Sequence, residues 1–212
     1  MADEKRVDKG LRRIQCGVFV VTAQQDGRDN GCVVNTVLQS TSNPEGLIVM
    51  MNKSGLTHDM VMQTKRFCVS VLDETAPYAL FERFGMRSGR DGDKFEGLEE
   101  VGRAENGLPF LSRHACAMYT VDVEQTIDLG THTLFAGKLT QGRTLSGEKA
   151  QTYSGYHENV RPKREEPKKQ EQQEKKTGWV CTVCGYIYEG EELPADFTCP
   201  LCGHGAADFE KL

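Results

Sequence analysis

The chain has 212 residues, of which 38% are hydrophobic and 27% charged, and its formal net charge is −5. This length suits one ordinary domain with a small module, or two small domains. No apolar run reaches the roughly 18 to 20 residues that span a bilayer, and the charged segment 1–10 lacks the apolar core of a secretory signal. The folded regions show no basic stripe, so we expect a cytoplasmic protein that binds neither membrane nor nucleic acid.

Residues 1–160 carry nearly all the apolar patterning, and this patterning is mainly of the β type. The predicted strands are 16–22, 30–38, 47–51, 66–72, 115–129 and 133–139, the last two paired through Gly130. The predicted helices are 7–14, 57–65 with Ser54 or Thr57 as N-cap, and 77–84 with Thr75 as N-cap. Many strands without βαβ alternation favour a mainly β fold, a barrel with a few helices, over a doubly wound dinucleotide domain.

Two further regions follow the first. Residues 161–177 contain no hydrophobic side chain, and seven of them are Lys or Arg and four are Glu. Such a segment cannot bury a core, so we predict a charged flexible linker between a domain at 1–160 and a small module at 178–212. A charged helix is the alternative for the linker, although Pro162 and Pro167 limit it.

The small module holds two cysteine pairs with metal-ligand spacing. The pairs are Cys181-x2-Cys184 and Cys199-x2-Cys202, and each is followed by a glycine. Two such turns facing each other form a tetrahedral site of four sulfurs, and the glycines permit the positive φ that the returning chain needs. The other four cysteines, which we expect to be small buried side chains in a reducing compartment, are Cys16, Cys32, Cys68 and Cys116.

Spacing alone leaves the metal open, because zinc and iron both accept four tetrahedral sulfurs. The segments GWVCTVCGYIYEG and LPADFTCPLCG resemble the two halves of a rubredoxin, which implies one iron ion. Five aromatic residues would pack around the metal in that case, whereas a zinc ribbon needs no aromatic shell. Only fourteen residues, 185–198, separate the pairs, and this short insert resembles the rubredoxin-like module of rubrerythrins.

The first region resembles the flavin reductase family over about residues 8–160. The resemblance rests on the order and spacing of GVFVVTAQQDGRDNGCVVNTVLQSTSNP, MMNKSGLTHDM, RFGMRSGRDGDKF, LGTHTLFAGKL and TYSGYHE. Members of this family bind FMN in a split β-barrel and form dimers. The resemblance therefore implies an FMN-binding split β-barrel with a few helices, a homodimer, and NADH or NADPH as electron donor.

The candidate FMN-binding residues fall into two groups. A phosphate suits the cations, hydroxyls and glycine-loosened turns near a helix start, in the segments Asn52, Lys53, Ser54, Thr57 and Ser88, Gly89, Arg90, Lys94. The pyrimidine edge of the flavin suits polar side chains that alternate on and after one strand, namely Asn35, Thr36, Gln39 and Thr41. By the family resemblance His132 is the catalytic histidine near the flavin and the nicotinamide. Taken singly, each of these residues is also compatible with an ordinary turn or strand end.

Electron counting orders the two sites. A nicotinamide delivers two electrons as hydride, a four-sulfur iron accepts one, and a flavin handles either. The whole arrangement resembles the high-molecular-weight rubredoxins of anaerobic bacteria, which implies transfer from NAD(P)H to FMN to iron and on to a flavodiiron protein that reduces oxygen or nitric oxide. The alternatives are an FMN and iron carrier reduced by another protein, and a binding module with a zinc-containing tail.

Overall fold

The computed structural model describes residues 14–162 and 178–212. The chain divides into two compact units between Pro162 and Lys163. The helix predicted over 7–14 and the linker predicted over 161–177 lie, except for their outermost residues, outside the described part of the chain. The exact domain limits therefore stay a prediction.

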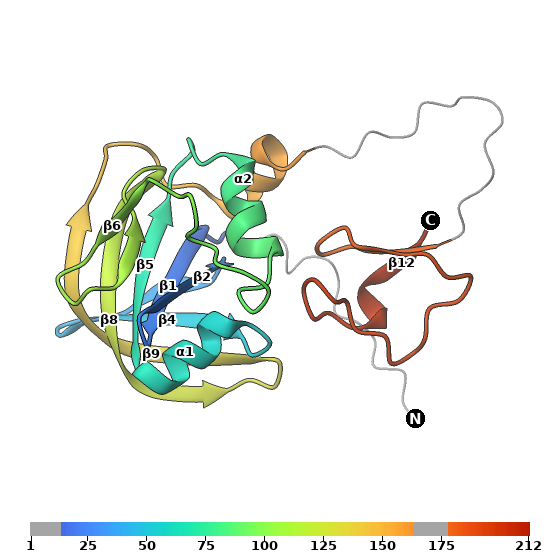
Figure 1. Ribbon diagram of the computed structural model, residues 1–212, viewed down its shortest axis with the longest axis horizontal. Coiled ribbons are helices and arrows are strands. Elements are labelled where there is room, and N and C mark those ends of the chain that lie inside the picture. The colour runs from blue at the N-terminus through green and yellow to red at the C-terminus, as the bar shows by residue number, and fades with distance from the viewer. Residues whose placement is uncertain (1–13, 163–177) are drawn as a thin grey trace. The chain divides into compact units, whose positions relative to one another are not determined.

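The larger unit is built on one antiparallel sheet of seven strands that curls into a barrel (Figure 1). Along the sheet the strand order is β2-β1-β5-β8-β9-β4-β3. The bounds of these strands are β1 Phe19–Gln25, β2 Arg28–Val34, β3 Val37–Ser42, β4 Glu45–Asn52, β5 Arg66–Leu72, β8 Ala115–Asp128 and β9 His132–Thr144. The predicted mainly β barrel is confirmed.

Branched and aromatic side chains from alternate strand positions fill the barrel. Val21, Val49, Phe67, Val121 and Phe135 come from five different strands, and each is 0% exposed. Full burial of one such side chain contributes about 1.5 to 3 kcal/mol relative to leaving it in water. The shared core therefore holds strands together that lie far apart in the sequence.

Two strand predictions need correction near the amino end. The first strand begins at Phe19 rather than residue 16, because Gly17 forms only an isolated bridge with Thr152. The hairpin turn to β2 lies at Asp26 and Gly27, which both have positive φ. The second predicted strand, 30–38, is two strands interrupted at residues 35 and 36. The strands predicted over 66–72, 115–129 and 133–139 are confirmed as β5, β8 and β9, and β9 continues further, to Thr144.

The helices lie where predicted but begin differently. Helix α1 covers Leu56–Thr64, and its N-cap is Gly55 rather than Ser54 or Thr57. Helix α2, Tyr78–Phe81, continues as the π-helix η2, Glu82–Met86, and its N-cap is Pro77 rather than Thr75. Thr75 instead donates its hydroxyl hydrogen to Asp73. The remaining elements of this unit, which the sequence patterns did not reveal, are β6 Val101–Arg103, β7 Pro109–Leu111, α3 Tyr153–Gly155 and η3 Tyr156–Val160.

The smaller unit has a three-stranded sheet of order β11-β10-β12. Its elements are β10 Trp179–Cys181, β11 Ile187–Tyr188, the short 3-10 helix η4 Ala206–Asp208 and β12 Phe209–Lys211. Its core consists mainly of cysteines and aromatic rings, and Val183 and Leu193 pack against them. Among the described residues of both units, no helix has the length and apolar composition needed to cross a membrane.

Candidate metal centre and flavin site

The four cysteines of the smaller unit converge on one point. All four sulfur atoms lie within 4.8 Å of one another. The Sγ atoms of Cys181 and Cys202 are 3.6 Å apart, and those of Cys184 and Cys199 are 3.4 Å apart. A tetrahedron with metal–sulfur bonds of about 2.3 Å has edges of about 3.8 Å. The spacing therefore fits one tetrahedral metal ion.

Two loops of the same design present these sulfurs. In each loop the glycine after the second cysteine has positive φ, 84° at Gly185 and 72° at Gly203, and its N–H donates to the carbonyl of the first cysteine. This curl directs further N–H groups at sulfur. The backbone of Tyr186 donates to Cys184, and that of His204 donates to Cys202. Such donors stabilise thiolates and tune a bound metal.

Two of the four thiols resist ionisation when no cation is bound. Burial raises the pKa of Cys184 to about 11 and raises that of Cys202 as well. Burial acts on Cys181 in the same direction, but N–H donors from Cys184 and Val183 outweigh it and lower its pKa. A divalent or trivalent cation removes this conflict, because it holds all four sulfurs as thiolates. The donor set therefore fits a thiophilic metal.

Aromatic rings enclose this centre on one side. Phe197 lies 4.7 Å from Tyr188 and 5.3 Å from Phe209 between ring centroids. Cys181 and Cys199 are buried against this cluster, whereas Cys184 and Cys202 are partly exposed. An exposed ligand gives electrons a short path to the surface.

The predicted phosphate residues of the first group lie at the amino end of helix α1. No side chain caps this helix, so the first backbone N–H groups remain available to an anion. Ser54 donates its hydroxyl hydrogen to Asn52, and the Lys53 ammonium lies 2.5 Å from Asp128. An uncapped helix start beside a lysine and a hydroxyl fits a phosphate group.

The second predicted phosphate segment is held against the same helix. The guanidinium of Arg90 donates to Asp59 in the first turn of α1 at 2.6 Å. Arg28 donates to the carbonyl oxygen of Gly89, and the Ser88 hydroxyl accepts from the N–H of Arg90. The structure therefore brings two segments together that are more than thirty residues apart in the sequence.

Lys94 has a different place from the one predicted for a phosphate ligand. Its ammonium group is buried and donates to the carbonyl oxygens of Gly31 at 2.9 Å and Phe84 at 3.1 Å. Burial lowers its pKa, and the neighbouring Cys32 partly offsets this. Lys94 therefore connects β2 to the π-helix.

Asn30 is a residue of this region that the sequence analysis did not single out. Its side chain is 2% exposed and donates to the hydroxyl of Thr57 at 3.0 Å. Thr57 is itself buried, and it also hydrogen-bonds Cys32. The only sequence signal was a polar residue at the start of an apolar run, which also occurs at ordinary strand ends.

His132 begins strand β9 at this same end of the barrel. It lies opposite Asn52 in the β4–β9 ladder, and its Nδ1 is 2.8 Å from the hydroxyl of Thr131. The carbonyl of Thr131 also accepts the N–H of Lys53. Thr131 is thus a partner that can orient the His132 ring.

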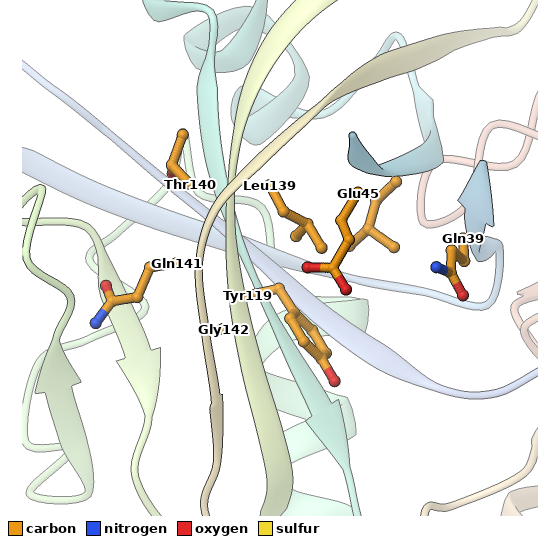
Figure 2. Close-up of a pocket in the computed structure, with 8 residues that line it drawn as sticks. Gln39, Glu45, Tyr119, Leu139, Thr140, Gln141 and Gly142 are labelled. Carbon is orange, nitrogen blue, oxygen red and sulfur yellow. The ribbon is translucent and has the colours of Figure 1, made fainter. Parts of the chain in front are cut away.

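The four residues predicted for the flavin ring do not share one strand. Asn35 and Thr36 lie between β2 and β3, where the Thr36 hydroxyl donates to the Asn35 side chain at 3.0 Å. Gln39 and Thr41 lie on β3, opposite the amino end of β4. Figure 2 shows Gln39 together with Glu45 and Tyr119 at a cleft, and the volume of this cleft is about 380 Å³. Along β4, at about 3.4 Å per residue, its lining residues Glu45 and Leu47 lie about 24 Å and about 17 Å from Asn52.

Comparison with known proteins decides the family. Residues 11–162 match the flavin reductase like domain, and residues 179–210 match the rubredoxin-like domain of rubrerythrin. The chain belongs to the flavin reductase-like family. It is 35% identical to a high molecular weight rubredoxin of Moorella thermoacetica, over 96% of this chain and 99% of that protein. The resemblance inferred from the sequence to the high molecular weight rubredoxins is thereby confirmed.

A further relative matches about two thirds of the chain. The chain is 37% identical to a ferric-chelate reductase (NAD(P)H) of Archaeoglobus fulgidus, over 68% of this chain and 85% of that protein. A solved NADH:FAD oxidoreductase of Streptomyces globisporus superposes with a TM-score of 0.62 at 21% identity, covering 73% of this chain and 95% of that one. The protein is an oxidoreductase with a flavin reductase-like domain and a four-cysteine rubredoxin-like module.

Proposed function

We propose that the chain is a reductase that takes electrons from NADH or NADPH, passes them through FMN to one iron ion held by Cys181, Cys184, Cys199 and Cys202, and delivers them to an external protein. The observation that supports this most directly is the combination of both sites in one chain, matched along its length by a high molecular weight rubredoxin. A bound flavin supplies the exchange between two-electron and one-electron chemistry.

The residues near helix α1 have separate tasks in this proposal. Lys53, Arg90 and the first N–H groups of α1 bind the phosphate, and the hydroxyls of Ser54 and Ser88 complete the site. Asn35 and Thr36 are close enough to the end of β4 to contact the ring, since the Thr36 carbonyl accepts from Met50 at 3.2 Å. His132, with its Nδ1 on Thr131, positions the nicotinamide.

A homodimer is part of the proposal, and an exposed apolar sheet face supports it. Leu38 and Ile127 are 59% and 51% exposed. They lie on the outer face of β3, β4, β9 and β8, where Leu38 pairs with Ile48, Met50 with Leu134, and Leu134 with Ile127. Apolar faces of this kind mark interfaces. Sedimentation velocity should give a dimer for the wild type and a monomer for Leu38→Glu/Ile127→Glu.

The acceptor is proposed from charge and family. Residues 178–212 carry six acidic side chains and one lysine, so this module should dock on a basic patch of its partner. The family resemblance suggests a flavodiiron protein. We place the protein in the cytoplasm, because no disulfide joins its eight cysteines.

An anaerobic mixing experiment tests the main step. NADH or NADPH added to the purified protein should bleach the flavin absorption and then the visible bands of the iron centre. If dithionite bleaches the flavin and neither nicotinamide does, the protein is the carrier of the alternative. A tail that stays colourless after flavin removal and contains zinc would contradict electron transfer through the cysteines.

A further inference from the structure

Lys94 is a buried cation with no acidic partner among the described residues. Its ammonium group donates to two backbone carbonyls, and the thiol of Cys32 lies near it. The guanidinium of Arg83, a second cation, donates to the Lys94 backbone carbonyl at 3.2 Å. Burial raises the pKa of that thiol, so it is neutral at pH 7 and does not balance the charge. A buried charge without a counter-charge is expensive, commonly several kcal/mol, and proteins normally pair it.

The charge lies directly behind the amino end of helix α1. Cys32 is next to Lys94 and also hydrogen-bonds Thr57, the second residue of the helix. Asn30 holds the same threonine at 3.0 Å and packs against Gly89 of the second phosphate segment. One layer of side chains therefore separates the ammonium group from the uncapped helix start.

Several positively charged or partly positive groups lie near the start of helix α1. The N–H groups of α1, the exposed Lys53 and Arg90, and the buried Lys94 all favour an anion at the same place. Lys53 and Arg90 each have a carboxylate partner, Asp128 and Asp59. Lys94 differs, because the partner that its charge requires is missing from the described residues.

We propose that Lys94 is a positioning residue whose charge is balanced by the phosphate of bound FMN through the layer of Cys32 and Thr57, without contact between them. This rests on the proposed flavin function. The bonds to Gly31 and Phe84 fix the ammonium group in place, so that it favours the doubly charged phosphate and is indifferent to a neutral flavin.

The experiment compares two flavins that differ only in the phosphate. Dissociation constants for FMN and riboflavin are measured by fluorescence quenching on flavin-free full-length protein. Lys94→Met should weaken FMN by about tenfold or more, and riboflavin by no more than about twofold. Lys138→Met removes the same charge from an exposed position on β9 and should change neither constant.

If Lys94 only stabilises the fold, Lys94→Met gives a different result. If Lys94→Met weakens both flavins by the same factor, or weakens neither, the counter-charge role is wrong. A crystal structure of the FMN complex with the Lys94 ammonium on a phosphate oxygen would make Lys94 a direct ligand and would also overturn it. Failure of the wild type to bind FMN contradicts the proposed function instead, and the two failures are thus distinguishable.

The wild-type protein offers a second measurement if Lys94→Met does not fold. NMR of 13C-labelled lysine follows the titration of Lys94, whose charged neighbours Arg83 and Asp93 and the thiol of Cys32 are the same with either flavin. A charge balanced by phosphate is stabilised, so FMN should raise the pKa of Lys94, whereas riboflavin should leave it unchanged. Equal effects of both flavins, or no effect of FMN, would refute the proposal.

Discussion

We expect the single methyl group added by Gly89→Ala to move residues 88–90 away from the start of helix α1, and these are the two segments of the proposed phosphate site. A Cβ atom built on Gly89 lies 2.3 Å from the Asn30 Oδ1, and real Cβ contacts are essentially never shorter than 3.0 Å. Gly89→Ala therefore forces a displacement of about 0.7 Å, the difference between these distances. Either Asn30 gives up its bond to Thr57, or residues 88–90 move away from helix α1.

The magnitude follows from the contacts that are lost. One buried hydrogen bond contributes about 0.5 to 1.5 kcal/mol, so the melting temperature should fall by roughly 1 to 6 °C. FMN affinity should fall by about tenfold, since the phosphate loses its alignment with Arg90. Thermal unfolding and fluorescence titration of the flavin-free protein measure the two effects.

Gly92→Ala provides the matched control. It is the same substitution in the same loop, and nothing lies within 4 Å of the added Cβ. We expect wild-type stability and wild-type FMN affinity for it. Equal FMN affinity in Gly89→Ala and Gly92→Ala would refute the reasoning, because it would show that the spacing between Asn30 and residues 88–90 does not matter for the cofactor.

Three further predictions concern single residues. Cys199→Ser, at a sulfur that is buried in the cluster, should remove the iron bands and transfer to a partner protein, while NADH oxidation with an artificial acceptor persists; loss of both would contradict two separable sites. Burial acts to raise the pKa of Asp59, but Arg90 and His58 outweigh it and hold the pKa below 3.8. Stability from this pair should thus be complete above about pH 4 and lost as pH falls through the lower folded pKa, and Asp59→Asn should remove that acid limb from a denaturation profile. Burial raises the pKa of Cys68 to about 12, so iodoacetamide at pH 8 should label it only after unfolding, as peptide mass mapping can check.

The sequence predicted most where the determinants are local. The apolar run with branched and aromatic residues in 66–72 identified β5 correctly, and the cysteine spacing identified a metal-ligand set without any knowledge of the fold. The run CVVNTVL hid the break between β2 and β3, because the interruption at residues 35 and 36 has no Gly or Pro to mark it. Three-residue strands such as β6 are too short for a periodic signal.

Contacts over long distances in the sequence account for the other errors. Thr57 looked like an N-cap, but its hydroxyl contacts Asn30, which is 27 positions away, and the cap is Gly55. Lys94 belongs to a candidate phosphate segment, but the sequence does not reveal its contact with Gly31, which is 63 positions away. No local pattern encodes such contacts, because the barrel must first close before these residues meet.

The break at Asn35 and Thr36 also determines how the barrel closes. Strands β2 and β3 are neighbours in the sequence but are the two outer strands of the sheet. A connection of two residues spans at most about 10 Å. The end of β2 and the start of β3 must therefore lie close together, although no ladder pairs these two strands. The edges of β2 and β3 are thus joined only by the connection at residues 35 and 36, and no ladder pairs the two strands along the rest of their length. A longer connection at residues 35 and 36 would let the two edges separate, and a flavin ring bound there would lose one of its walls.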